Sequence, residues 1–221
     1  YVRKSWIYWY GTKQKLEITI PNLTIEGVGE KPEDVVIEWD SLYGLVDAGG
    51  FTHTTDSTQT VAIRESAHNV TIKNGTLNVA TEASNKFYIL VQNYANLTID
   101  NATLDGTNLD KWSTVENNWD SYTLSNNSGN VNISNSKIIA NNDGIKSFAF
   151  DACKSTYYTA PIVTLGENVT IEGNVELSGG QLYHNIAGIN ATVKKTFTPQ
   201  TEQFYWNTIS APIVGGATIP T

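Results

Sequence analysis

Aliphatic and polar residues alternate in five similar segments of this chain. In each segment the second and fourth residues are aliphatic, while the residues around them are mostly polar. The segments are NLTIEG (22–27), NVTIKNGTL (69–77), NLTIDNATL (96–104), NVNISNSKI (130–138) and NVTIEG (168–173). Because successive side chains of a strand point to opposite faces, this period of two predicts β-strands with one buried face. No stretch keeps the 3.6-residue period of an amphipathic helix.

The sixth position of each segment predicts a sharp bend. It holds only glycine or asparagine, the two residue types that enter the left-handed α region most readily. These residues are Gly27, Asn74, Asn101, Asn135 and Gly173. In the three middle segments an aliphatic residue follows three positions later, which predicts a second short strand beyond the bend. These aliphatic residues are Leu77, Leu104 and Ile138.

The order of strand, bend, second strand and return is typical of stacked coils, as in a solenoid. A hairpin meander would need two-residue turns between neighbouring strands. The dipeptide Asn-Gly occurs once, at Asn74-Gly75, inside a segment. An all-β solenoid is therefore the expected fold, and the alternative is an antiparallel β-sandwich with asparagine-rich turns.

The repeated segment resembles the right-handed parallel β-helix of the pectin-lyase-like proteins, in which such a corner carries stacked asparagines. The resemblance implies a ladder of Asn74, Asn101 and Asn135 at the strand spacing of roughly 4.8 Å. It also implies an internal column made of Ile25, Ile72, Ile99, Ile133 and Ile171. The long gap between the first two segments is expected to hold an extra coil at residues 35–39.

The repeats divide the chain into three parts. Residues 16–178 are expected to form the coils, since all five segments lie there. Residues 1–15 include the aromatic run WIYWY (6–10) and are expected to cap the open end of the solenoid, with a sugar-stacking platform as the alternative. Residues 179–221 are expected to form a second cap or flanking strands, or to lead into a further module.

The charge balance argues against nucleic acid as a partner. The 221 residues carry 14 Lys and Arg against 22 Asp and Glu, a net charge of −8, and no basic cluster follows one face. No apolar run approaches the roughly 20 residues of a membrane span. Methionine is absent, which indicates a processed or excised chain. We expect it to belong to a longer extracellular or cell-surface protein.

Cysteine and histidine offer little for catalysis or metal binding. The single Cys153 excludes an intramolecular disulfide and is expected to be a small buried apolar residue. The three histidines, His53, His68 and His184, follow no local pattern. Their scatter disfavours a zinc site or a Ser-His-Asp triad. No cofactor is therefore expected, and calcium is the one metal considered below.

The first 80 residues also resemble the opening coils of pectinesterases. The shared phrases are YGTKQKL (10–16), IPNLTIEG (20–27), VVI (35–37), TTDSTQTV (54–61) and NVTIKN (69–74). That family uses one carboxylate as nucleophile, a second as acid and base, and amides that hold the oxyanion. Its two catalytic motifs, Gln-Asp-Thr-Leu and Asp-Phe-Ile-Phe-Gly, are not retained, because GTNLD (106–110) and NDGIK (142–146) stand in their places.

Three carboxylates remain as candidates for a catalytic pair. Asp143 is the one residue that matches the second motif, and Asp105 or Asp110 could substitute in the first. A lyase of related fold would need a base beside a calcium-binding carboxylate cluster, for which Asp100, Asp105, Asp110 and Lys111 have the required side chains. These residue types are common on any solenoid surface, so neither activity is the first expectation.

The loop at residues 109–122 holds residues typical of a carbohydrate-binding site. An aromatic ring stacks on the face of a sugar, while a carboxylate accepts protons from the sugar hydroxyls. The candidates are Trp112, Trp119, Tyr122, Asp110 and Asp120. The alternative is that the same rings hold the loop against the coils.

The sequence thus predicts a non-catalytic β-helix module that binds a polysaccharide or cell-surface glycan, or that serves adhesion or structure. The alternative is a carbohydrate-active enzyme of the pectin-lyase-like group, of the pectinesterase or polysaccharide lyase type. A carboxylate within roughly 6 Å of Asp143, in a groove with Lys or Arg, would favour the enzyme. An Asp143 that serves a turn would favour binding.

Overall fold

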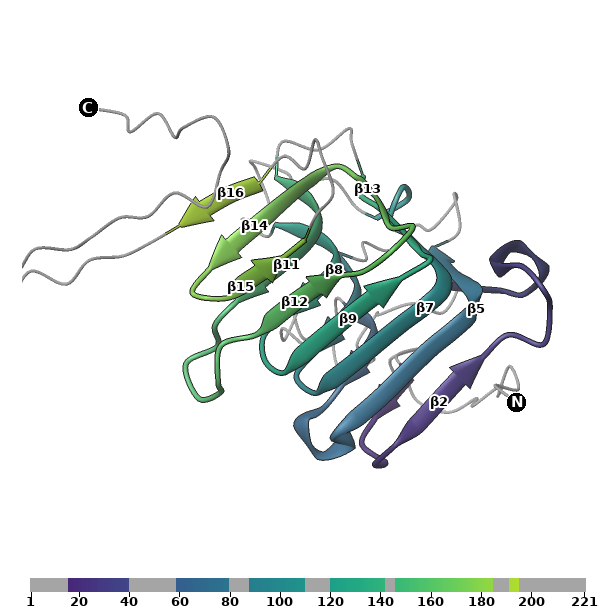
Figure 1. The fold of residues 1–221 in the computed structure, drawn as a ribbon, viewed down its shortest axis with the longest axis horizontal. Coiled ribbons are helices and arrows are strands. Elements are labelled where there is room, and N and C mark those ends of the chain that lie inside the picture. Colours follow the sequence, from purple (N-terminus) through teal and green to yellow (C-terminus); the bar gives the residue numbers. More distant parts are fainter. Residues whose placement is uncertain are drawn as a thin grey trace, which may run out of the picture.

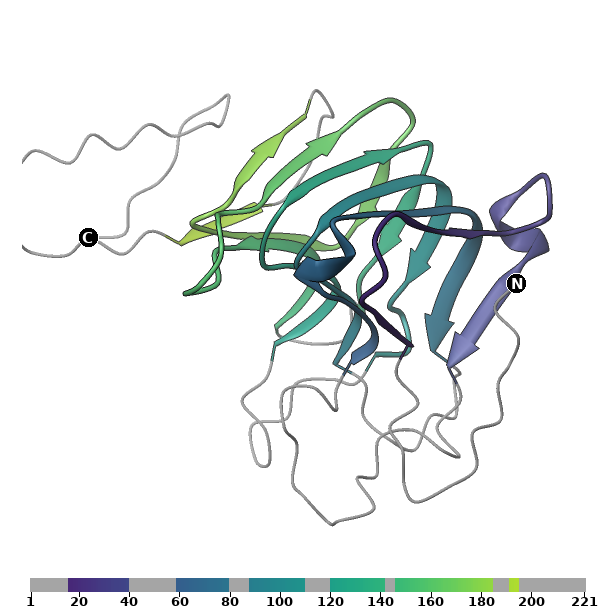
Figure 2. The same ribbon diagram turned by 90° about the horizontal axis from the view of Figure 1, so that it is seen from below.

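The computed structural model describes residues 16–39, 59–79, 88–109, 120–141, 146–184 and 191–194. The strands in these residues belong to two sheets (Figure 1). Neighbouring strands within each sheet pair in parallel, which excludes the antiparallel sandwich for this part of the chain. The chain passes from one sheet to the other and back, so each coil adds strands to both. Figure 2 shows the coils following one another from the purple to the yellow-green end. In the described segments, no helix has the length and apolar character that crossing a membrane requires.

The first sheet contains seven strands in the order β1-β4-β6-β8-β11-β14-β16. They are β1 (Leu16–Ile18), β4 (Gln59–Ile63), β6 (Ile89–Asn93), β8 (Ser121–Asn126), β11 (Ser147–Cys153), β14 (Asn174–Ser178) and β16 (Ala191–Lys194). One fully buried residue from each of five neighbouring strands lies in register and forms a wall of the core. These residues are Val61, Val91, Leu124, Phe150 and Val175.

The second sheet contains nine strands. They are β2 (Leu23–Glu26), β3 (Val36–Trp39), β5 (Asn69–Val79), β7 (Asn96–Asp105), β9 (Asn130–Ser134), β10 (Lys137–Ile139), β12 (Ile162–Leu165), β13 (Thr170–Glu172) and β15 (Gln181–Tyr183). Two 3-10 helices of the described residues lie in connections between strands: η1 (Pro32–Asp34) and η4 (Glu65–Ala67). β5 and β7 run through the bend, whereas other coils place two short strands there. Figure 1 shows β2, β5, β7, β9 and β12 side by side.

The connections between the two sheets differ in length. From the first sheet to the second, β6 and β7 are joined by residues 94–95, and β8 and β9 by residues 127–129. From the second sheet back to the first, the connections include residues 40–58, 80–88 and 106–120. The three longest connections of the coils, residues 40–58, 80–88 and 106–120, thus all lead from the second sheet back to the first.

Asparagines lie at the bends in the second sheet, as the pattern predicts. Asn74, Asn101 and Asn135 have positive φ values of 54°, 48° and 48°, and Asn168 has one of 53°. Gly27 differs, because it is not among the described residues with positive φ. The carbonyl group of Asn74 lies so close to it that a Cβ would not fit. Glycine is required at this position by the close approach of two backbones.

The prediction that Ile171 of the fifth segment belongs to the internal column is wrong, because this segment lies on the other side of the bend. Leu165, not Ile171, pairs with Ile133 and continues the internal column. Ile171 lies beyond the bend and pairs with Ile138. Asn168 therefore occupies the corner itself rather than the start of a strand. The same alternation precedes and follows each bend, so a period of two does not distinguish the two strands of a coil.

The extra coil predicted at residues 35–39 is also wrong. β3 pairs with the second half of β5, where Ile37 lies beside Leu77. β2 pairs with the first half, where Ile25 lies beside Ile72. β2 and β3 are therefore two strands of a single coil. The long gap in the sequence arises from the connection at residues 40–58.

The expected caps lie mostly outside the described residues. The aromatic run at residues 6–10 is wholly outside them. Beyond Ser178 both sheets continue, because β15 pairs with β12 and β16 pairs with β14. The rest of the C-terminal part, residues 185–190 and 195–221, is also outside.

Asparagine amides at the bends link neighbouring coils. Asn101 Nδ2 donates to Asn74 Oδ1 at 3.0 Å, and Asn168 Nδ2 donates to Asn135 Oδ1 at 3.0 Å. Between these two pairs, Asn135 Nδ2 donates instead to Asp100 Oδ1 at 2.9 Å. The file of bend asparagines thus consists of two amide pairs joined through a carboxylate.

Asn101→Ala is expected to lower the free energy of unfolding by about 2–3 kcal/mol. Alanine in the left-handed region costs about 1–2 kcal/mol, and the amide hydrogen bond to Asn74 contributes about 1 kcal/mol more. Asn101→Gly is the matched control, because it keeps the bend and loses only the amide. Urea denaturation measures both losses, and equal losses in the two variants would show that the left-handed conformation contributes nothing.

Candidate functional site

Asp105, one of the candidate catalytic carboxylates, serves a turn at the end of β7. Its Oδ1 accepts hydrogen bonds from the backbone N–H of Thr107, at 2.9 Å, and from the hydroxyl of the same residue. Its two partners in register on the neighbouring strands are not carboxylates. The other two candidates, Asp110 and Asp143, lie outside the described residues.

Asp100, from the set considered for calcium, makes hydrogen bonds between coils. Asn135 Nδ2 donates to it at 2.9 Å and Ser134 Oγ at 2.8 Å. These two hydrogen bonds hold the pKa of Asp100 below its usual value. Among the described residues, no group of three or more His, Cys, Asp or Glu side chains is placed to hold a metal ion. Lys111 lies outside the described part of the chain.

Two of the five carbohydrate-binding candidates, Asp120 and Tyr122, are described, and both contact the coils. The ring of Tyr122 stacks on Phe148, with centroids 5.3 Å apart and an interplanar angle of 17°. Its hydroxyl lies 2.7 Å from Glu176 Oε2 and 3.2 Å from Asp120 Oδ2. Asp120 Oδ1 lies 3.5 Å from Lys146 Nζ. The remaining candidates lie outside the described residues; they are Trp112, Trp119 and Asp110.

Asp151 and Glu176 form a buried pair of carboxyl groups that no sequence motif indicates. They lie side by side in register on β11 and β14, and each exposes 3% of its surface. Asp151 stands between two core residues, Phe150 and Ala152, so its side chain leaves the strand on the face opposite the core. The one available signal is a carboxylate inside the apolar run FAFDAC (148–153).

Burial keeps Asp151 protonated at neutral pH. It raises the pKa of Asp151 to about 8, against the opposing effect of hydrogen bonds from the Asn126 N–H and the Ser125 hydroxyl, and the nearby Glu176 raises it further. Cys153 is half-buried, and burial together with Asp151 raises its pKa, so it is a thiol rather than a thiolate. A carboxyl group that keeps its proton at neutral pH suits the role of a general acid. With 3% exposure, however, neither carboxyl group is open to a sugar.

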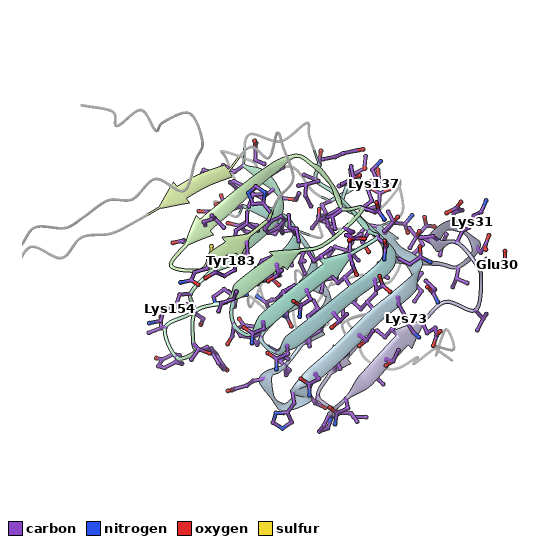
Figure 3. All side chains as sticks on the ribbon, in the orientation of Figure 1. Glu30, Lys31, Lys73, Lys137, Lys154 and Tyr183 are labelled. Atoms are coloured by element: carbon purple, nitrogen blue, oxygen red, sulfur yellow. The ribbon has the colours of Figure 1, made fainter. Side chains whose placement is uncertain are left out.

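A pocket of about 430 Å³, here called the tyrosine pocket, opens on the side of the solenoid where the chain passes from the first sheet to the second. It is lined by Arg64, Glu65, Ser66, Tyr94, Ser155, Tyr157 and Tyr158. The last three belong to the connection between β11 and β12, residues 154–161, at the start of which Figure 3 labels Lys154. This volume falls within the range of roughly 300–1,000 Å³ for ligand sites.

The pocket exists because residues 154–161 reach over the shorter turn of the preceding coil. Ser155 N donates to Asn127 O at 3.3 Å. Tyr158 thereby meets Tyr94 from two coils away, with ring centroids 5.1 Å apart and an interplanar angle of 54°. Tyr157 is 91% exposed and presents its ring to solvent.

The residue types of the tyrosine pocket suit a sugar. A tyrosine ring covers the apolar face of a pyranose, and the guanidinium of Arg64, the carboxylate of Glu65 and the hydroxyl of Ser66 are suited to hydrogen bonds with its hydroxyl groups. These side chains come from three connections that are far apart in the sequence. The dipeptide Tyr157-Tyr158 was the one local signal. Comparisons with known protein families, with curated proteins and with solved structures found no match.

Proposed function

We propose that this chain is a non-catalytic carbohydrate-binding module of an extracellular or cell-surface protein. The observation that carries the proposal is the tyrosine pocket, which combines an exposed ring with charged and hydroxyl groups. A polysaccharide or cell-surface glycan is the partner. A stack of coils is a rigid support for such a pocket, which suits an adhesive or structural part of a longer protein.

The proposal includes a right-handed parallel β-helix of the pectin-lyase-like kind. Two all-parallel sheets connected in alternation support it. Crossovers between parallel strands of one sheet are right-handed in almost all proteins, because only that hand packs back onto a twisted sheet. The bend asparagines are the further point of resemblance.

Tyr157→Ala is expected to weaken the binding of a neutral oligosaccharide by about 3- to 10-fold, because an aromatic stacking contact is lost. Tyr157→Phe is the matched control, since it keeps the ring and removes only the hydroxyl. A glycan array identifies the ligand and titration calorimetry measures the affinities. Equal binding by the wild type and Tyr157→Ala would contradict the proposed pocket. If only Trp112→Ala and Trp119→Ala lost binding, the site would lie in the 109–122 loop instead.

A second candidate function is a carbohydrate-active enzyme of the pectinesterase or lyase type, in which the neighbouring carboxyl groups of Asp151 and Glu176 would have to become open to the sugar. Asp151 and Glu176 lie side by side in register, and burial raises the pKa of Asp151 to about 8, which suits a general acid. Incubation with pectin, followed by assays for methanol and for unsaturated sugars, tests this function. Release of either product that disappears in Asp151→Asn would replace the binding proposal.

A further inference from the structure

The outer face of the second sheet carries two straight files of uncharged polar side chains. The first, the amide file, consists of Asn69, Asn96 and Asn130, which begin β5, β7 and β9, and of Asn22, which directly precedes β2. The second, the hydroxyl file, lies two residues further along and consists of Thr24, Thr71, Thr98, Asn132, Thr164 and Tyr183. Together they are called the Asn/Thr face. At the strand spacing the hydroxyl file extends for roughly 24 Å.

The amide file is held rigid by its own hydrogen bonds. Asn69 Nδ2 donates to Asn22 Oδ1 at 3.0 Å, and Asn96 Nδ2 donates to Asn69 Oδ1 at 3.1 Å. The file ends where the backbone N–H of Asn130 donates to Asn96 Oδ1 at 2.9 Å. Each amide has two donor hydrogens and two acceptor lone pairs, so the ladder uses only part of its capacity. The four side chains are exposed on the outer face of the sheet, where the remaining donors and acceptors meet solvent.

The hydroxyl file is open to solvent over its length. Thr24, Thr98, Asn132 and Thr164 are exposed, and Thr71 is half-buried. Their side chains alternate with the core aliphatics along each strand, and they therefore project straight away from the sheet. The result is a flat row of hydroxyl and amide groups with a methyl group on every threonine.

An exposed aromatic ring closes the hydroxyl file. Tyr183 on β15 lies in register with Thr164 and is 56% exposed (Figure 3). Its hydroxyl donates to Gln181 Oε1 at 2.9 Å, which orients the ring. An exposed tyrosine ring offers an apolar face on which a sugar ring can stack. Tyr183 thus adds a stacking surface to the periodic row of polar groups.

The charge pattern selects the class of ligand. Neither file contains a charged side chain, although the chain as a whole has a net charge of −8. The charged residues begin one file further along, where Lys73 Nζ lies 3.0 Å from Glu26 Oε1 and the two charges offset one another. A polyanion would find no cation in either file, whereas a neutral chain of hydroxyl-bearing rings meets donors, acceptors and methyl groups.

We infer that the Asn/Thr face binds an extended, uncharged polysaccharide whose chain runs across the strands, along the files. The inference rests on the proposed carbohydrate-binding function and specifies its substrate class. The amide file begins directly after the turns that line the tyrosine pocket, since Asn69 follows Ser66 and Asn96 follows Tyr94 at short distance in the sequence. The pocket accommodates a short sugar or chain end, and the face binds the polymer.

Affinity electrophoresis through gels that contain hydroxyethylcellulose, galactomannan or polygalacturonate tests the inference. The wild type is expected to be retarded by a neutral polymer and not by polygalacturonate. The double variant Thr98→Val/Tyr183→Ala is expected to raise the dissociation constant for the neutral polymer by about 10-fold or more, since one hydrogen-bond donor and one stacking ring are lost.

Thr103→Val is the matched control. Thr103 lies on the same strand, β7, faces outward beyond the bend, and has Lys137 as its neighbour in register. The Thr103→Val variant is expected to be retarded like the wild type. Denaturation curves of all variants show whether any loss of retardation comes from unfolding. If Tyr157→Ala lost its retardation by the neutral polymer while the double variant was retarded like the wild type, the inference would be overturned and the tyrosine pocket would remain as the binding site. Retardation by polygalacturonate but by neither neutral polymer would overturn the inference that the polysaccharide is uncharged. Absence of retardation in every gel, together with absence of oligosaccharide binding, would overturn the proposed function as well.

Discussion

Gly27→Ala is expected to lower the free energy of unfolding by about 3 kcal/mol, or to prevent the first coil from docking. A Cβ at this position would collide with the carbonyl oxygen of Asn74 and would lie 2.8 Å from its carbon and 3.1 Å from Val35 Cβ. Two of these three atoms belong to the backbone of the next coil, which cannot give way as a flexible side chain can. Forcing extra volume into a closely packed site costs about 1–3 kcal/mol, and more where backbone must move.

Gly166→Ala is the matched control for this variant. Its Cβ would find Ile133 O at 3.3 Å as the nearest atom, and Gly166 is not among the residues with positive φ. A small effect is therefore expected there. Urea denaturation followed by circular dichroism measures both changes, and similar losses in the two variants would contradict the close approach at Gly27.

Asp151→Asn is expected to make the protein more stable than the wild type above pH 8. In the wild type the pKa of Asp151 is raised from 3.8 to about 8 by burial, so the folded state keeps a proton that the unfolded state has released. The wild type therefore loses stability as pH rises from about 4 to about 8, by up to about 1.4 kcal/mol per pH unit. Below pH 4 both states are protonated and the group has no effect; above pH 8 the full penalty of a buried charge applies.

Asparagine removes that penalty without changing the shape of the side chain. Its carbonyl oxygen still accepts from the Asn126 N–H, and its amide is able to donate to Ser125 Oγ. The expected gain above pH 8 is on the order of a few kcal/mol. Urea denaturation of both proteins from pH 4 to pH 9 measures the difference. A difference that stays constant across this range would show that Asp151 does not titrate there.

The repeated segments predict the strands of the second sheet well, because their buried face is continuous. Ile72 and Ile99 lie in register as the alignment of their segments requires. The alignment fails at Ile171, since the local alternation is the same on both sides of a bend. Only the pairing with a neighbouring coil distinguishes the two strands, and pairing is a long-range property.

The sites were less accessible to sequence analysis than the fold. Asp151 lies in a strand of the first sheet, which the repeated segments do not include, and its partner Glu176 comes from another coil. The tyrosine pocket joins Tyr94 to Tyr158 across an intervening turn. Such sites arise from the stacking of coils and leave no local sequence pattern. The candidates at residues 109–122, by contrast, were predicted because they are neighbours in the chain.

The unequal connections on the two sides of the solenoid have a consequence for how such a chain tolerates change. The pairing of strands sets the register of a coil: β12 pairs with β9 although the connection before β12 is residues 154–161 and the corresponding turn before β9 is only residues 127–129. Doubling the length of a flexible loop costs only about 0.6 kcal/mol. A connection such as residues 154–161 is thus able to acquire new peptide sequence, while strand pairing keeps the pitch of the coils constant.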